Sequence, residues 1–478
     1  MIQSSELPAS DLLSDQLVAN VFEQENIEFG IGHDDVFTPA VTLWAMVSQF
    51  LFSATGRSIK AAAGRVVSLY AQLEGRVIAQ NAGNLCRAKA KIPVSALKKL
   101  TRSLAAQAEL GAGRVDDLAT PLEPDEVEQR LCPKTIAQIR SRPITGRLIN
   151  VDGFTIDAPD TRANQKAYPQ NPAQAEGIGF PILRCVGLVS MATGMLIDLA
   201  SAPYSGKGSG ETTLLHQLKD SLRPGDILIA DSYYCTYWLI CMCQMIGVDV
   251  VMKNHHKRED DPQGAHRISD KERTVAWLRP KKPTWMSKRE YRKMPETLTM
   301  RLSDVATSDF NSRCDSFTIA TTMLSIQQYP LDWLGSLYQG RWMIETDIES
   351  IKCTMGLEHL RSQSPEGLQR ELWTGLFTYN LVRSKMLESA RSSNRETRSL
   401  SFSETYQVLS TNWLLCACVG VSEPMKSASR GQSVSAVVGN RPGREEPREN
   451  KRRPKTIKLM KIPRSAFHAA RAATSKIP

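Results

Sequence analysis

The chain has 478 residues, of which 41% are hydrophobic and 23% are charged, a composition typical of globular proteins and sufficient for two to four domains. The longest apolar run, residues 41–54, is too short to span a bilayer, and no signal peptide is predicted. We therefore expect a cytoplasmic protein without a membrane partner and with reduced thiols. The C-x-C pairs Cys241/Cys243 and Cys416/Cys418 lack histidines at zinc-finger spacing, which argues against structural zinc, and the first pair is predicted to pack in the core.

Positive charge is unevenly distributed along the chain, whose net charge is +10. No Lys or Arg precedes Arg57, whereas residues 75–108 contain seven Lys/Arg and no acid. Residues 423–478 contain fourteen Lys/Arg against four Glu. Such segregation is typical of proteins that bind a polyanion, most simply nucleic acid, although a solvated surface with a disordered tail gives the same composition.

The first 140 residues are interpreted as an acidic segment, 1–36, followed by an all-helical DNA-binding domain, 37–140. A first helix begins at Thr38, which is a suitable N-cap, and further helical patterns cover residues 58–73 and 95–110. No helix-turn-helix consensus identifies a recognition helix. The cations that we expect to contact DNA are Lys98, Lys99 and Arg102.

After Arg147 the pattern becomes that of a mixed α/β domain, predicted to cover residues 147–388. Strands are predicted at 148–157, 181–191, 194–200, 226–231, 248–252 and 317–323, and helices at 211–222, 234–246 and 366–386. A polar, basic insertion at about 255–316 is expected to hold short strands. A helical segment, 389–423, and a basic tail, 424–478, which is interpreted as disordered, follow.

Residues 331–352 predict a helix with a narrow charged stripe. At about 100° per residue, with Tyr338 at zero, Arg341 falls near ~300° and Glu345 near ~340°. Lys352 falls near ~320° by the same arithmetic. An ordinary amphipathic helix explains this pattern by itself, and Glu349 lies on nearly the same face as Glu345.

Two predicted strands each carry a carboxylate. Asp152 lies within strand 148–157 and Asp231 ends strand 226–231. Because two-metal phosphoryl transfer needs several carboxylates at one point, neighbouring strands are a suitable place to hold them. A lone Asp at a strand end is more often a turn former. The carboxylates that spacing leaves as competitors are Asp157, Asp160 and Glu349.

Several motifs carry a family resemblance. Tyr338-x-x-Arg341-x-x-x-Glu345-x-x-x-x-x-x-Lys352 resembles the Y-R-E-K signature of DDE-type bacterial insertion-sequence transposases, insertion-sequence family four. Further blocks follow the family's order over roughly residues 37–388: 151–155 with 160–164, 229–234, 276–286, 321–322 and 379–383.

The resemblance implies an RNase H-like catalytic core with a β-rich insertion. Asp152, Asp231 and Glu345 would bind two Mg²⁺ ions, with Mn²⁺ as a substitute, to cleave transposon ends in double-stranded DNA and join them to a target. A homodimer is expected in the DNA-bound complex. By the same comparison, the residues that would hold the cleaved DNA end are Tyr338, Arg341, Trp342 and Lys352.

Three further expectations come with this interpretation. Trp277 or Trp285 would stack on a DNA base from the insertion, with packing in the core as the alternative. Location at the nucleoid follows if the chain binds DNA. The competing hypotheses are an RNase H-like nuclease that cuts without joining and a non-catalytic DNA-binding derivative.

Overall fold

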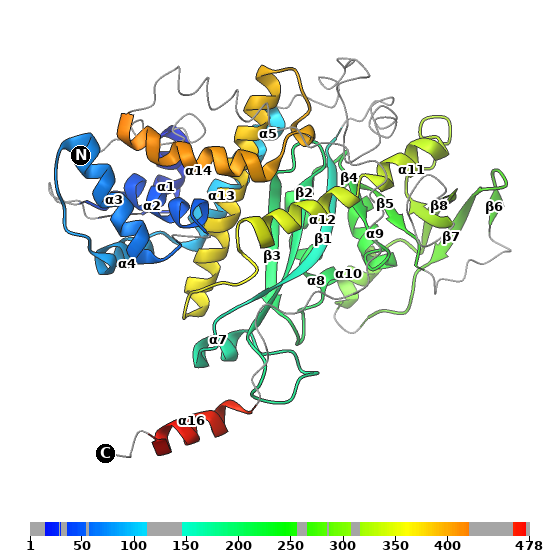
Figure 1. The fold of residues 1–478 in the computed structure, drawn as a ribbon. Coiled ribbons are helices and arrows are strands. Elements are labelled where there is room, and N and C mark those ends of the chain that lie inside the picture. The colour runs from blue at the N-terminus through cyan, green and yellow to red at the C-terminus, as the bar shows by residue number, and fades with distance from the viewer. Residues whose placement is uncertain are drawn as a thin grey trace.

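The computed structural model describes residues 15–27, 29, 36–53, 57–111, 146–255, 265–283, 286–306, 316–419 and 462–474. A nine-stranded mixed sheet, with strands in the order β3-β2-β1-β4-β5-β9-β8-β7-β6, carries helices on both faces (Figure 1). The strands are β1 (Leu148–Asp157), β2 (Ile182–Ser190), β3 (Leu196–Pro203), β4 (Ile227–Ala230), β5 (Asp249–Lys253), β6 (His266–Arg267), β7 (Glu272–Leu278), β8 (Thr297–Ala306) and β9 (Ser316–Thr321).

The described helices cover both faces of this sheet and one end of it. They are α1 (Asp15–Gln24), α2 (Pro39–Leu51), α3 (Ile59–Glu74), α4 (Ala82–Lys91), α5 (Val94–Gly111), α7 (Arg162–Ala167), α8 (Glu211–Gln217), α9 (Tyr237–Met245), α10 (Lys288–Lys293), α11 (Leu331–Gln339), α12 (Trp342–Glu349), α13 (Pro365–Ser392), α14 (Phe402–Val419) and α16 (Arg464–Thr474). A π-helical segment, Ser350–Thr354, follows α12 directly. None of the helices in this described part combines the length and apolar character needed to cross a membrane.

Alternating side chains give the centre of the sheet two apolar faces. Ile149 and Val151 on β1 belong to the core shared with α8 and α9. Their neighbour Leu148, with Ile227 and Ile229 on β4, belongs to the core shared with α11. This period-two alternation of side chains along β1 and β4 places the two sets of helices on opposite faces of the sheet.

The insertion is part of the same sheet. Its strand β8 pairs with β9 from Arg301↔Thr321 to Ala306↔Ser316, and β7 and β6 continue outward. The buried Arg301 donates to Glu272 and to the carbonyl of Tyr329, just before α11. The predicted short strands are therefore present, but β8 is ten residues long and extends the central sheet.

Helices α2, α3 and α4 pack on one another, α2 and α3 contact α14, and α2 and α5 pack on α13. Thr38 and Ser58 cap α2 and α3 as N-cap acceptors, which confirms two predicted starts. Helix α4 was not predicted, because it is polar overall and buries only Leu85 and Ala88 of its ten residues. Cys241 and Cys243 lie buried in α9, as the sequence predicts.

The single long helix predicted through residues 331–352 is wrong. Around Gly340 the backbone makes i−3 hydrogen bonds, such as Met343 N to the Gly340 carbonyl at 3.1 Å, and α11 ends there. The side-chain amide of Asn150 on β1 donates to the same carbonyl at 3.3 Å. After α12 the π-helical turn shifts the register again, so the uniform 100° step does not hold across the stretch.

The C-terminal regions also differ in part from the prediction. Helix α13 continues to Ser392, and α14 accounts for most of the predicted segment 389–423. Within the tail predicted to be disordered, α16 is helical and lies apart from the sheet (Figure 1). The rest of the tail, like residues 112–140 of the predicted N-terminal domain, lies outside the described residues.

Candidate active site

The register of the central strands brings the two strand carboxylates together. Strands β1 and β4 are parallel, with Asn150 paired to Ile229. Two residues further along, Asp152 and Asp231 follow on the face that carries α11 and α12, because side chains alternate along a strand. Backbone amides fix both carboxylates: Gly153 N donates to Asp152 at 2.7 Å, and Tyr233 N donates to Asp231 at 2.9 Å.

Helix α12 supplies the third carboxylate. It packs on β1, and the hydrogen bond between Asn150 and the Gly340 carbonyl holds its beginning against that strand. Glu345 lies in its first turn, and its carboxylate accepts from the Arg341 guanidinium at 2.9 Å. The same guanidinium lies 3.9 Å from Asp152, so one cation lies between a strand carboxylate and the helix carboxylate.

The electrostatics of Asp152 reflect this crowding. Burial, with smaller contributions from the negative charges of Asp231 and Glu345, raises the pKa of Asp152 to about 6. The Gly153 amide and Arg341 act in the opposite direction. Carboxylates that repel one another in a partly buried place favour a cation between them.

The donor chemistry fits a hard divalent cation, since all three groups are carboxylates that lie on β1, on α12 or directly after β4. In this structure Arg341 provides the positive charge between two of them. Within the described ranges no three His, Cys, Asp or Glu side chains are close enough to share one ion. The carboxylates thus interact electrostatically without forming a single-ion site in the arrangement seen here.

The other residues of the predicted stripe have different surroundings. Tyr338 packs against Phe317 at a ring distance of 5.1 Å, and burial raises its pKa to about 12. Trp342 is 47% exposed. Lys352, on the π-helical turn, lies 3.8 Å from Glu358. Of the four, Trp342 therefore presents the most open side chain beside Glu345.

The three cations predicted to contact DNA on α5 all have partners within the chain. Lys99 forms an ion pair with Glu25 at 2.5 Å, and Arg102 forms one with buried Asp198 on β3 at 2.9 Å. The Lys98 ammonium lies 5.2 Å from the centre of the Trp373 ring on α13. These contacts fasten α5 to its neighbours.

The competing carboxylates at the end of β1 lie elsewhere. Asp157 is five residues, or about 17 Å, along the strand from Asp152, and it lies 3.7 Å from His359. Asp160 accepts from Gln165 and pairs with Arg464 of α16. Neither is near the Arg341 contact that joins Asp152 and Glu345.

Of the two tryptophans of the insertion, only Trp277 lies within the residues that the structure describes. Trp277 is 7% exposed and belongs to the core beneath α8 and α9, which favours the packing alternative. Trp285 lies outside the described residues.

One carboxylate beside the site was not predicted. Glu211, the first residue of α8, lies on the opposite face of β1, where a Cβ on Gly153 would collide with its carboxylate. Tyr234 donates to it at 3.1 Å, and burial together with Glu211, Asp152 and Asp231 raises the pKa of Tyr234. The glycine directly after Asp152 is the sequence signal that points to such a close approach.

Three comparisons with known proteins bear on this arrangement. Residues 144–381 match the family described as "Transposase DDE domain". The chain is 25% identical over 261 residues to "Transposase InsG for insertion sequence element IS4" from Escherichia coli (strain K12), an alignment that covers 54% of this chain and 56% of that protein. The chain thus spans little more than half the length of that curated relative.

A solved structure of piggyBac transposase in a synaptic complex with hairpin DNA aligns with a TM-score of 0.41 and 9% identity. The alignment covers 91% of this chain and 86% of that one, and a likeness at this level establishes no shared fold.

The structure defines an α/β protein with a group of carboxylates beside its central strands. The matched segment, which contains Asp152, Asp231 and Glu345, identifies the chain as a member of the DDE-type transposases, related to the transposase of element IS4.

Proposed function

We propose that this chain is an active transposase that binds the inverted-repeat ends of its insertion sequence, cleaves them and joins them to target DNA. The observation that carries the proposal is that Asp231 and Glu345 both act electrostatically on Asp152, with Arg341 between Asp152 and Glu345. We assign strands β3-β2-β1-β4-β5 to an RNase H-like core, and β6 to β8 to its insertion. Its place of action is the bacterial cytoplasm, on the nucleoid.

Asp152, Asp231 and Glu345 would hold two Mg²⁺ or Mn²⁺ ions, which when bound polarise the attacking and leaving oxygens of a phosphoryl transfer. The chain itself supplies the alignment. Backbone amides orient Asp152 and Asp231, and the anchored start of α12 orients Glu345. Arg341, which neutralises Glu345 in this structure, is placed to exchange that carboxylate for a DNA phosphate.

The DNA end would lie along α12. Exposed Trp342 offers a face for stacking on a terminal or flipped base, and Lys352 offers a charge to a phosphate. Tyr338, near Arg341 and Asp231, would donate a hydrogen bond from its hydroxyl to a phosphate of the same DNA end. Cleavage through a DNA hairpin is one route compatible with a stacked end.

The N-terminal helices are the proposed end-binding region, with a homodimer in the complex with double-stranded DNA. Lys98, Lys99 and Arg102 are proposed to contribute there. Since each already contacts Trp373, Glu25 or Asp198, phosphate binding has to replace or share those contacts. We therefore expect each to contribute less than an unpaired surface cation.

The test uses the full chain, Mg²⁺, a labelled DNA fragment that carries the element's end, and a target plasmid. Wild type is expected to release the end and then form a joined product. Asp152→Asn, Asp231→Asn and Glu345→Gln should each abolish both products while end binding is retained. Cleavage without joining would identify a nuclease instead, and end binding without any cleavage would identify a non-catalytic derivative.

A further inference from the structure

A buried carboxylate lies behind the proposed metal-binding helix. Asp347 is two residues after Glu345 on α12 and has no exposed surface. At about 100° per residue, the two side chains point about 200° apart around the helix axis. Glu345 therefore faces the strand carboxylates while Asp347 faces the interior.

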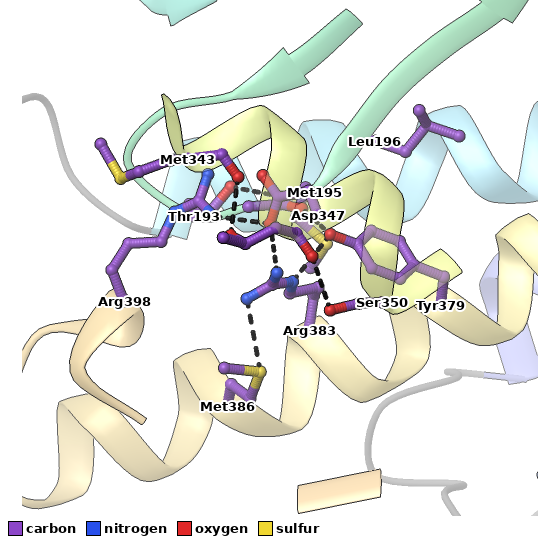
Figure 2. A network of polar contacts seen from close by, with 12 residues as sticks. Thr193, Met195, Leu196, Met343, Asp347, Ser350, Tyr379, Arg383, Met386 and Arg398 are labelled. Atoms are coloured by element: carbon purple, nitrogen blue, oxygen red, sulfur yellow. Dashed lines mark hydrogen bonds and ion pairs between the residues drawn. The ribbon is translucent and has the colours of Figure 1, made fainter. Parts of the chain in front are cut away.

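Two arginines from later segments meet Asp347 (Figure 2). Arg383 of α13 donates to Asp347 Oδ1, and Arg398 donates to the same oxygen at 2.7 Å. Arg398 is on the short 3-10 turn Thr397–Ser399 that follows α13. One carboxylate oxygen on α12 thus contacts two successive elements, at residues 36 and 51 positions later in the chain.

The arginines in turn hold the hairpin between β2 and β3. Arg398 donates to the carbonyls of Ser190 and Met191 at 2.8 and 2.9 Å. Arg383 donates to the Tyr379 hydroxyl at 2.9 Å, and that hydroxyl donates to the Gly194 carbonyl at 2.8 Å. The anchor of α12 is therefore the sheet itself, through the strand next to β1.

This anchor is electrostatically costly. Asp347, Arg383 and Arg398 are largely removed from water, and the second oxygen of Asp347 has no hydrogen-bond partner among the described residues. Apolar side chains of similar size often replace such buried pairs without loss of stability. We therefore explain the buried ion pairs of Asp347 by the orientation of α12 that they fix.

We propose that Asp347, held by Arg383 and Arg398, is a positioning residue that sets the rotation of α12 and so directs Glu345 toward Asp152 and Asp231. Helix α12 has only eight residues, and Asn150 fixes its start at Gly340. The Asp347 contacts fix its rotation at a second point, about two turns later. The inference rests on the proposed metal-binding function of the three carboxylates.

The test measures Mn²⁺ affinity by electron paramagnetic resonance of the free ion, together with the melting temperature, in the full chain without DNA. Asp347→Asn should weaken Mn²⁺ binding by about tenfold or more, as loss of a positioning partner typically does. Glu272→Gln is the matched control, because it also leaves a buried arginine, Arg301, without its carboxylate, away from α12. The control should lower the melting temperature similarly but keep Mn²⁺ affinity within about twofold of wild type.

Glu345→Gln defines the affinity that depends on the carboxylate site. If wild type and Glu345→Gln differ but Asp347→Asn binds Mn²⁺ like the control, the positioning role is wrong and the proposed function stands. If wild type and Glu345→Gln bind alike, the carboxylates hold no metal and both proposals fail. Should Asp347→Asn not fold, Arg398→Gln removes one of the two partners and must show the same selective loss of affinity.

Discussion

At the scale of single residues, Asp152 combines a place within a central strand with a pKa raised to about 6 by burial. The sequence predicted that Asp152 lies on a strand, and it predicted the family of the chain. It did not predict the burial or the Arg341 contact, because these depend on how α12 packs against β1. Glu211 was missed for the same reason, since it approaches from the opposite face of the sheet.

The raised pKa predicts that Asp152→Asn stabilises the metal-free protein at pH 8. The folded pKa lies above the usual value near 3.9, so this carboxyl favours folding only at low pH, and its contribution is lost as pH rises through about 6. Asn keeps the shape without the buried charge. We expect a gain of about 1–3 kcal/mol in the free energy of unfolding by urea at pH 8.

At pH 4 the same substitution should change the unfolding free energy little, because Asp152 is then protonated in the folded state. An equal gain at both pH values would show that the charge is not the cause, and a loss at pH 8 would contradict the assignment of the pKa.

The same residue predicts how metal binding depends on pH. A carboxyl with a pKa near 6 must lose its proton before it can bind a cation, so Mn²⁺ competes with H⁺ at Asp152. Below pH 6 the Mn²⁺ affinity should fall by roughly tenfold per pH unit for one released proton. Calorimetric titrations at pH 5, 6 and 7 measure this dependence, and an affinity that stays constant across them would contradict it.

At the scale of elements, local periodicity predicted most helices and strands but failed around Gly340. There, Asn150 of β1 donates to a backbone carbonyl of the helix, and α11 ends. A contact with a side chain 190 residues earlier leaves no trace in a helical pattern. Helical periodicity therefore predicts neither the break between α11 and α12 nor the π-helical turn.

The close approach of α8 to β1 gives a prediction of its own. A Cβ at Gly153 would overlap the Glu211 carboxylate and displace the end of that side chain, so Gly153→Ala should destabilise the protein by about 1 kcal/mol. Glu211→Ala shortens the opposing side chain and makes room for this Cβ. The double variant should therefore recover most of the unfolding free energy that Gly153→Ala loses. Urea unfolding of the two single variants and the double variant measures the coupling. Losses that simply add would rule out the steric explanation.

At the scale of the whole molecule, the N-terminal helices, the strands β6 to β8 and the central α/β region are joined by contacts that sequence periodicity does not report. Buried Arg57, between α2 and α3, donates to the Gly356 carbonyl after the π-helical turn and pairs with Glu371 of α13 at 2.6 Å. The insertion joins the central sheet through β8. These contacts join segments that composition alone separates, and the predicted domain limits stay a prediction.

The basic C-terminal tail gives a prediction at this scale. Residues 423–478 contain fourteen Lys/Arg against four Glu, and Arg464 contacts Asp160. If the tail binds DNA phosphates, a chain that ends at residue 422 should show a shallower fall of DNA affinity with salt, by about 0.9 in slope per lost contact. Fluorescence anisotropy between 50 and 200 mM salt measures the slope. An unchanged slope would show that the tail does not contact DNA.

The central claim is that Asp152, Asp231 and Glu345 form one catalytic centre, and the comparison of Glu345→Gln with Glu349→Gln tests it most directly. Both glutamates lie on α12, one turn apart, and spacing alone did not separate them. Single-turnover cleavage of a labelled element end with Mg²⁺ is the measurement. We predict no detectable cleavage by Glu345→Gln and near wild-type cleavage by Glu349→Gln. Normal cleavage by Glu345→Gln would contradict the account.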